Sequence, residues 1–364
     1  MKKMKVYLDR RQSRSYEICI GYDIIDRIAM MIAGSRVAGR YVIMTDDCVG
    51  SLYGGTLLDH LRNMGVSADM VIFPAGERSK NFQTVLNLAG QLLTLGADRQ
   101  TALIALGGGV VGDLTGFIAS IFMRGVPCIQ IPTTLMAQVD SSIGGKTAID
   151  LTQGKNLLGT FCQPAGVFMD IKCLDTLPES EYQSGLAEVV KYGVIDSEAL
   201  FQQLEGGVES IRSRKRPFLE EVIETSCMIK KGIVEMDERE QGLRRILNFG
   251  HTLGHALESA SEYRFSHGSA IALGMIGAAR LSQKLYGLPE DQCERVERLI
   301  ASLGLICRIP SNMATRDILA GLQRDKKKEG DTVHFVMLKK IGLPFINGGV
   351  PAQLLRETIE ELKG

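Results

Sequence analysis

TALIALGGGVVGDLTGFIAS, residues 101–120, combines the two patterns that decide the fold, a buried strand and a helix joined by glycines. Its first six residues are typical of a strand covered on both faces of a sheet. The glycines at 107–109 end the strand, and Gly112 and Asp113 open a helical pattern. Backbone N–H groups in such a turn can approach a phosphate, and a helix start adds positive potential. A turn needed only for packing is the alternative. The motif is not the usual GxGxxG fingerprint, but its glycine density favours a phosphate or pyrophosphate site.

The first half of the chain alternates strand patterns with amphipathic helix patterns. Apolar residues have helical spacing at, for example, 56–64 and 81–95. Strands that alternate with helices and with glycine or proline turns indicate an α/β layer with a largely parallel sheet. The predicted strands are 5–9, 16–20, 40–46, 68–74, 101–109 and 128–134.

After about residue 172 the pattern becomes helical and strand signals nearly vanish, apart from a possible late pair at 333–338 and 343–348. We therefore expect an α/β domain over 1–172 and a helical domain over 173–364, with the cleft between them as the default ligand site. The predicted helical segments are 180–193, 197–214, 216–236, 246–260, 269–286 and 290–303.

Charge and cysteine usage narrow the class of protein. Lys plus Arg equals Asp plus Glu, 42 against 42, which argues against a nucleic-acid or anionic-membrane partner. No apolar run is long enough to span a bilayer, and the basic N-terminus lacks the apolar core of a signal peptide. The eight cysteines are scattered without a CxxC pair. This usage predicts reduced thiols in a cytoplasmic protein.

Polar residues after two predicted strands point to a nucleotide. Asp46 follows one strand, and Glu77 and Lys80 follow another. An acidic residue at a strand end can accept hydrogen bonds from ribose hydroxyls. Strand ends are commonly polar, so Asp46 alone carries little weight, but as a set these residues favour a nucleotide site.

The segment 131–161 gathers polar residues that suit an anionic small molecule. Its GGK sequence resembles the end of a P-loop, but position 140 is not glycine, which argues against a Walker ATPase. Two lysines beside glycines suit a phosphate or carboxylate, and a solvated basic loop remains an equal alternative. The candidates are Thr133, Thr134, Asp140, Ser141, Ser142, Lys146, Lys155 and Asn156.

A third group of residues suggests a metal. Glu188 and Lys191 share a helix face with apolar neighbours, so both are expected to be partly buried and in need of a charged partner. His251, His255 and His267 are three of the chain's five histidines and fall within 17 residues. Together with a buried glutamate they fit a site for Zn²⁺ or a similar ion. The spacing does not say which two histidines bind; the third is free to donate a hydrogen bond or move a proton.

The run Lys326 to Lys328 is interpreted from its pattern alone as a solvated charge run before a strand.

Most of the candidate residues above lie within long sequence motifs. GGGVVGDLTGFIAS, FMRGVPCIQIPTTLMAQVDSSIGGKTAI, GKNLLG, SGLAEVVKYG and LNFGHTLGHALE occur in this order. Together they resemble the 3-dehydroquinate synthase family, from about residue 40 to 345. The wider fold group includes glycerol dehydrogenase and other sugar-phosphate cyclases.

The resemblance implies a Rossmann-like NAD⁺-binding domain, a helical metal-binding domain and a cytoplasmic homodimer. It implies a lyase of the shikimate pathway, in aromatic amino acid biosynthesis. This activity converts 3-deoxy-D-arabino-heptulosonate 7-phosphate to 3-dehydroquinate and phosphate. The implied steps are transient oxidation by NAD⁺, phosphate elimination, re-reduction, ring opening and an intramolecular aldol closure.

The resemblance also implies a role for each matched residue. Glu188, His251 and His267 would bind Zn²⁺ or Co²⁺, and His255 would contact substrate or relay a proton. Near the substrate phosphate the resemblance places Lys146, Asn156, Lys326 and Arg124, with Arg124 acting across the dimer. The substrate carboxylate would be bound by Lys230, Arg244 and Asn248. The hydroxyls would be bound by Asp140 and Lys191. The residues expected near NAD⁺ are Asp46, Glu77, Lys80, Gly109, Val110, Val111, Gly112, Asp113, Thr133, Thr134, Lys146, Lys155, Cys173 and Thr176.

Three other functions compete with this one. A cyclase acting on a sugar phosphate without a carboxylate would not need Lys230, Arg244 and Asn248 together. A polyol dehydrogenase would release NADH and would not need so many cations. A non-catalytic nucleotide-binding protein would need neither metal-type residues nor the cations.

Overall fold

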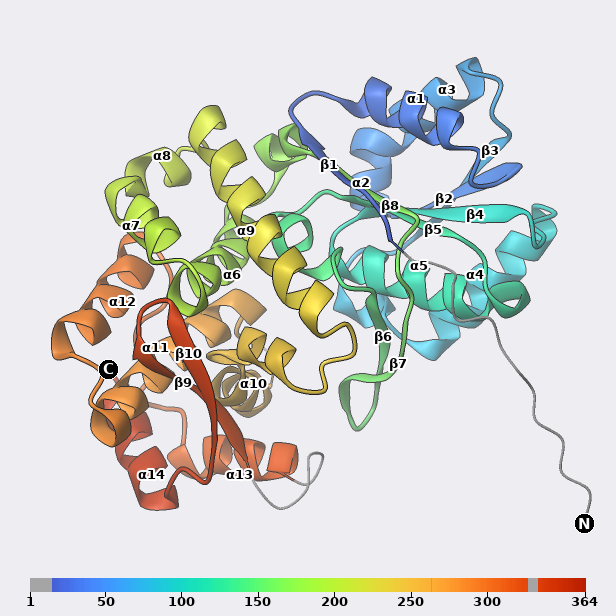
Figure 1. Ribbon diagram of the computed structural model, residues 1–364. Helices are drawn as coiled ribbons and strands as arrows, with labels where there is room; N and C mark the ends of the chain where they lie inside the picture. The colour runs from blue at the N-terminus through green and yellow to red at the C-terminus, as the bar shows by residue number, and fades with distance from the viewer. Residues whose placement is uncertain (1–14, 263, 327–332) are drawn as a thin grey trace, which may run out of the picture.

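A computed structural model describes residues 15–262, 264–326 and 333–364, and a six-stranded parallel sheet organises its first half (Figure 1). The strand order is β1-β8-β5-β4-β2-β3, and every pairing within it is parallel. The prediction of a largely parallel α/β sheet is therefore confirmed. The strands are β1 (Ile18–Gly21), β2 (Arg40–Asp46), β3 (Ala68–Phe73), β4 (Thr101–Gly107), β5 (Cys128–Pro132) and β8 (Gly166–Asp170). The predicted strand at 5–9 lies outside the described residues.

Helices cover both faces of this sheet. Tyr41 and Ile43 of β2 pack with α1 and α3, whereas Val42 and Met44 pack with α4 and α5. Alternate residues of a strand point to opposite faces, so a strand covered on both sides must be apolar throughout. Figure 1 shows the two helix pairs on opposite sides of the sheet. The helices are α1 (Ile25–Ser35), α2 (Asp47–Val49), α3 (Gly55–Asn63), α4 (Phe82–Thr94) and α5 (Gly109–Ile121).

The sequence did not predict the antiparallel hairpin of β6 (Lys146–Leu151) and β7 (Gly154–Phe161), nor β8. The hairpin is largely exposed and rich in polar residues and glycine, so it carries no apolar run. All five residues of β8 are buried, but a run this short has no distinguishing periodicity.

The second half packs around α6 (Glu179–Ile195). Every residue of α6 from Ser184 to Ile195 is buried, which is typical of a helix surrounded by others. Glu188 and Lys191 are the charged residues in that run. The other helices are α7 (Glu198–Gly206), α8 (Val208–Arg212), α9 (Arg216–Met236), α10 (His251–Ala260), α11 (His267–Tyr286), α12 (Glu290–Ser302), α13 (Thr315–Lys326) and α14 (Ala352–Glu361).

The predicted late strand pair is confirmed as an antiparallel hairpin of β9 (His334–Lys340) and β10 (Leu343–Gly348). The boundary between two domains at residue 172 stays a prediction, although the last strand of the large sheet ends at Asp170. No helix in the described part of the chain is long and apolar enough to cross a bilayer.

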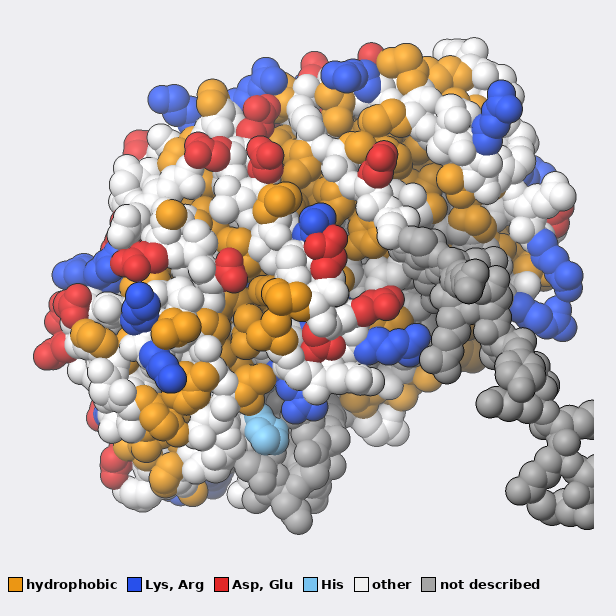
Figure 2. Space-filling model, in the orientation of Figure 1, with side chains coloured by type: hydrophobic (Ala, Val, Ile, Leu, Met, Phe, Trp, Pro, Cys, Tyr) orange, Lys and Arg blue, Asp and Glu red, His pale blue; other side chains and the backbone are white. Residues whose placement is uncertain are grey.

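Acidic and basic side chains are interspersed on the face of the molecule drawn in Figure 2. This distribution agrees with the equal numbers of the two charges in the sequence.

Two glycines bring α10 and α11 together. Gly250 precedes α10 with φ of 79°, a left-handed conformation that favours glycine. A Cβ added to Gly274 of α11 would overlap the carbonyl oxygen of Gly250. This close approach positions the start of α10, where His251 lies.

We expect Gly274→Ala to destabilise the protein by about 1–3 kcal/mol, since the methyl group must push α10 away from α11. Urea unfolding measures the change. Gly232→Ala, in α9, is the matched control because no atom lies within 4 Å of its added Cβ. That variant should unfold at the same or a higher urea concentration than the unaltered protein. Equal stability of the two variants would contradict the role of the close contact.

Candidate active site

Three side chains from three helices meet at one point. Glu188 lies in the middle of α6, His251 is the first residue of α10, and His267 is the first residue of α11. Glu188 Oε1 is 3.5 Å from His251 Nε2 and 3.6 Å from His267 Nε2. One potential ligand atom from each residue lies within 4.8 Å of the others. The structure thus brings together the three residues expected to hold the metal.

This cluster fits a divalent cation. Glu188 is 0% exposed; its Oε2 forms an ion pair with Lys191, and neither carboxylate oxygen accepts a hydrogen bond of regular geometry from a described residue. His251 Nδ1 lies 3.2 Å from the carbonyl oxygen of Phe249, which suits an N–H donor at Nδ1 and directs the Nε2 lone pair toward Glu188. One carboxylate and two imidazoles, with room for a further ligand, are a common set for catalytic zinc.

The electrostatics of the cluster favour a cation. Burial opposes ionisation of Glu188, but Lys191, His251 and His267 outweigh it and lower its pKa to about 2. Burial lowers the pKa of His251 to about 3, so this imidazole is neutral at pH 7. Burial also acts on His267, but Glu188 and Glu258 outweigh it and raise its pKa to about 9. Because a ligating imidazole must be unprotonated, a cation has to displace a proton from His267.

His255 lies beside this cluster on the same side of α10. Its ring centre is 5.4 Å from that of His251 and 6.1 Å from that of His267. A second group that could hold an ion joins His255 with Glu258 and His267. His255 is exposed, whereas all members of the Glu188 group are buried or half-buried. This difference favours the Glu188 group for the metal and places His255 on the exposed side of the cluster.

Buried charges of alternating sign extend from the cluster to Asp140. Lys191 forms an ion pair with Glu188. Lys230 on α9 donates to the carboxylate and to the backbone carbonyl of Asp140, both at 2.6 Å, and Tyr192 donates to the same carboxylate at 2.5 Å. Burial opposes ionisation of Asp140, but Lys230 and Lys191 hold its pKa well below the usual range. The expected hydroxyl-binding residues therefore adjoin the metal cluster.

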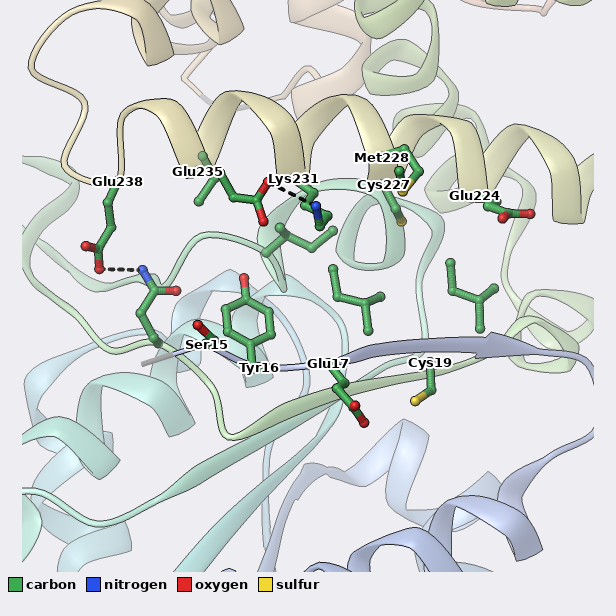
Figure 3. Close-up of a pocket in the computed structure, with 15 residues that line it drawn as sticks. Ser15, Tyr16, Glu17, Cys19, Glu224, Cys227, Met228, Lys231, Glu235 and Glu238 are labelled. Atoms are coloured by element: carbon green, nitrogen blue, oxygen red, sulfur yellow. Dashed lines mark hydrogen bonds and ion pairs between the residues drawn. The ribbon is translucent and has the colours of Figure 1, made fainter. Parts of the chain in front are cut away.

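The structure distinguishes Lys230 from its neighbour Lys231. Lys231 is exposed and forms an ion pair with Glu235 at 2.9 Å (Figure 3). It lines a cavity of about 690 Å³ between α9 and β1. None of the residues that line this cavity was expected to bind substrate, cofactor or metal. The choice of Lys230 as a site residue agrees with its position.

Glu240 is a residue of this region to which the sequence analysis gave no role. Its carboxylate forms an ion pair with Lys146 and accepts a hydrogen bond from Asn248 Nδ2 at 3.1 Å. Both partners were expected to bind anionic groups of the substrate. Glu240 also has a left-handed φ of 56°, which is uncommon for a side chain of this size. The acidic run at 237–240 marks this segment, but its residue types do not specify which side chain lies toward Lys146.

Arg244 is buried, at 1% exposed, and its guanidinium donates to the carbonyl oxygens of Gly144 and Glu238. Its Nε has no hydrogen-bond partner within the described ranges. In this conformation Arg244 holds backbone around Gly144, and its contact with a substrate carboxylate stays a prediction.

The glycine turn after β4 has a packing role, and its role in binding a phosphate stays a prediction. Added Cβ atoms at Gly107 and Gly112 would clash with Val111 and Gln130, so these two glycines serve packing. Gly108 starts α5 without a side-chain cap, which leaves the N–H groups of the first turn to a ligand.

Lys80 connects this turn with the β6–β7 hairpin. Its Nζ is 2.5 Å from Asp113 Oδ2, the fifth residue of α5, and 2.5 Å from Asn156 Oδ1 in β7. Glu77 lies 4.0 Å from the same Nζ. Residues expected at the nucleotide and at the phosphate are therefore in direct contact. Thr134 hydrogen-bonds the backbone of Ala137.

Other expected residues lie apart from these contacts. Asp46 caps α2 by accepting from Val49 N. Cys173 is buried, and Thr176 hydrogen-bonds Tyr53 at 2.5 Å. Arg124 is exposed at the end of the short helix Phe122–Arg124. Lys326 ends α13, and its side chain, like Lys327 and Lys328, lies outside the described part of the chain.

Comparison with known proteins decides the family. Residues 70–184 match the family model of the 3-dehydroquinate synthase N-terminal domain, and residues 185–328 match that of the C-terminal domain. The chain belongs to the 3-dehydroquinate synthase family. A 3-dehydroquinate synthase of Desulforamulus reducens is 45% identical over 331 residues, which cover 91% of this chain and 92% of the relative.

Solved structures of other synthases share the fold. A 2-deoxy-scyllo-inosose synthase, solved with carbaglucose-6-phosphate, NAD⁺ and Co²⁺, is 28% identical with a TM-score of 0.86, and the match covers 94% of this chain and 96% of that chain. A 2-epi-5-epi-valiolone synthase of Streptomyces hygroscopicus, solved with NAD⁺ and Zn²⁺, is 25% identical with a TM-score of 0.90, covering 98% and 99%. The expected fold, a Rossmann-like domain followed by a helical region, is confirmed.

Metal content tests the assignment of the histidines. We expect His267→Ala to lose the bound metal, because Glu188 and His251 alone offer too few ligands, and His255→Ala to keep about one ion per chain. Elemental analysis after gel filtration measures both variants. Metal loss in His255→Ala with retention in His267→Ala would reverse the assignment.

Proposed function

We propose that this protein converts 3-deoxy-D-arabino-heptulosonate 7-phosphate into 3-dehydroquinate and phosphate, as a lyase of the shikimate pathway. The observation that carries the proposal is the Glu188–His251–His267 cluster beside the buried Lys191 and Lys230, in a chain of this family. Metal-type ligands next to buried cations suit a reaction on an oxygen of an anionic substrate.

The proposed cofactors are NAD⁺ and a divalent metal, either zinc or cobalt. The two solved relatives carry NAD⁺ with Co²⁺ or Zn²⁺, which supports both groups. Glu188, His251 and His267 would hold the metal, and the turn from Gly109 to Asp113 would receive the phosphates of NAD⁺. When bound, the metal would polarise the hydroxyl to be oxidised, and NAD⁺ would serve as the transient oxidant.

Cationic and amide side chains would bind the two anionic ends of the substrate. Lys146 and Asn156 are proposed for the phosphate, and Lys230, Arg244 and Asn248 for the carboxylate. Lys146 and Asn248 both contact Glu240 in the substrate-free protein. The phosphate of the substrate would take the place of this carboxylate at Lys146, because two negative groups beside one cation repel each other.

Proton transfer is assigned to side chains that surround the cluster. His255 is exposed and 5.4 Å, ring centre to ring centre, from His251, so it can exchange protons with solvent and with a ligand in the cleft. Asp140, held by Lys230 and Tyr192, would accept hydrogen bonds from substrate hydroxyls.

The test is phosphate release. With NAD⁺ and Zn²⁺ or Co²⁺, the purified protein should release phosphate from the heptulosonate phosphate without accumulating NADH, because the cofactor is restored each turnover. A colorimetric phosphate assay measures the release of phosphate, and absorbance at the NADH band measures any accumulation of NADH. Stoichiometric NADH, or no phosphate, contradicts the proposal.

Matched controls separate this activity from that of related cyclases. Sedoheptulose 7-phosphate, which lacks the carboxylate, should be a poor substrate. Lys230→Gln should lower kcat/KM by roughly 10- to 100-fold, the loss of one charge-assisted hydrogen bond. Lys231→Gln should change kcat/KM less than about twofold, since this side chain lines the cavity between α9 and β1.

We further propose a cytoplasmic homodimer. None of the eight cysteines, all of which lie within the described residues, forms a disulfide, which agrees with a reducing compartment. Phe82, Leu86 and Leu93 form one apolar stripe on α4 and are 48%, 52% and 57% exposed. A second copy of the chain would cover such a stripe, and the exposed Arg124 would be free to reach the other copy's site.

Sedimentation velocity tests the dimer. The unaltered protein should sediment as a dimer, and Leu86→Lys should shift it toward the monomer because a charge in the apolar stripe opposes burial. A monomeric unaltered protein would rule out this part of the proposal.

A further inference from the structure

Glu258 is a buried carboxylate next to the metal cluster whose role the function proposed above does not explain. It lies in the last part of α10 and is 4% exposed. Its Oε2 is 3.5 Å from Nδ1 of His267, and its Oε1 is 3.5 Å from Nζ of Lys155. A carboxylate rarely remains buried without positive or hydrogen-bonding partners, so both contacts are needed to retain it here.

The two nitrogens of His267 face two different carboxylates. Nδ1 faces Glu258, while Nε2 faces Glu188 at 3.6 Å. With a proton on Nδ1 directed to Glu258, the lone pair of Nε2 points at the proposed metal position. The Nε2 lone pair of His251 is directed in the same way by a backbone carbonyl, because Nδ1 of His251 lies 3.2 Å from the carbonyl oxygen of Phe249.

We propose that Glu258 is a positioning residue that fixes the ring orientation and tautomer of His267 for metal binding. The proposal rests on the metal site proposed above and adds a residue that would not itself bind the metal. A histidine ligand whose second nitrogen donates to a carboxylate is held in one orientation and is a more basic ligand. Loss of the carboxylate lets the ring rotate and both tautomers form, so fewer molecules present Nε2 correctly.

Lys155 holds the other oxygen of Glu258 and connects it to the first half of the chain. It lies in β7, within the hairpin that also carries Asn156. Its side chain is 34% exposed, against 5% for that of Glu258, so the lysine bears the solvent-facing side of the pair. Lys155, which belongs to the first half of the chain, therefore helps to fix the rotamer of Glu258 in the second half. Substitution of Lys155 should weaken metal binding less than substitution of Glu258.

The experiment measures metal affinity of the metal-free protein, by competition between Zn²⁺ and a chromophoric chelator and by titration with Co²⁺. Glu258→Gln keeps the shape of the side chain and removes its charge. We expect it to bind both ions about 10- to 100-fold more weakly, the usual effect of removing such a partner. Lys155→Met should show a smaller loss. Glu262→Gln, which alters an exposed carboxylate two residues beyond α10, should bind within about twofold of the unaltered protein.

Thermal unfolding in the presence of a chelator shows whether a variant is folded before metal is added. Weaker binding by a Glu258→Gln protein with an unchanged metal-free Tm supports positioning. Unchanged affinity overturns it. If Glu258→Gln is unfolded without metal, Lys155→Met decides: weaker binding supports the proposal, and unchanged binding overturns it.

Glu258 could instead be a metal ligand in the group with His255 and His267. In that case His255→Ala would lose the metal together with Glu258→Gln, and this outcome also overturns the proposal. The unaltered protein distinguishes failure of the proposed function from failure of the positioning role. If the proposed function is wrong, the unaltered protein binds no metal or releases no phosphate. Failure of the positioning role alone leaves both of those properties intact.

Discussion

A carboxylate at the centre of α6, that of Glu188, is buried within the helical half of the molecule, and the elements around it supply positive or ligating groups. A charge in such a place is costly unless it is compensated. Lys191 provides one partner from the same helix, and His251 and His267 provide two more from the first residues of α10 and α11. The close packing of Gly250 against Gly274 is what allows the first of these helix starts to reach the carboxylate. The packing of these helices therefore also determines the geometry of the proposed metal site.

The charges extend outward from this centre in an ordered way. Lys191 and Lys230 flank Asp140, Arg244 supports the backbone near Gly144, and Lys80 connects the nucleotide turn with the hairpin. Each buried cation contacts a carboxylate or a carbonyl in the absence of ligand. Because these partners come from both halves of the chain, the site is defined only when the sheet and the helices are packed together.

Much of this arrangement could be predicted from the sequence, for identifiable physical reasons. The continuous apolar run at 101–106 and the amphipathic pattern at 216–236 are strong signals, and both elements were located to within a few residues. The exposed β6–β7 hairpin has none and was missed. The three histidines were recognised as a group from spacing alone, but only the family motifs separated His255 from the two others. Glu258 lies on the face of α10 that carries His251 and His255, at i, i+4 and i+7, yet a single glutamate there is indistinguishable from an ordinary surface charge until burial is known. Glu240 depends on a left-handed backbone turn that no pattern of residue types specifies.

The contact of Glu240 with Lys146 and Asn248 has a consequence for the end of the catalytic cycle. When phosphate departs, the charge of Lys146 would otherwise be left uncompensated, and that cost would slow the departure. A tethered carboxylate that returns to the same place removes the cost and competes with rebinding of the free anion at a high effective concentration. Inorganic phosphate in solution would thus meet a Lys146 that is already paired, and a ligand with further binding groups would displace Glu240 more readily. The loop from Asp237 to Gly242 would then favour turnover by weakening product inhibition while leaving the bond-breaking step unaffected.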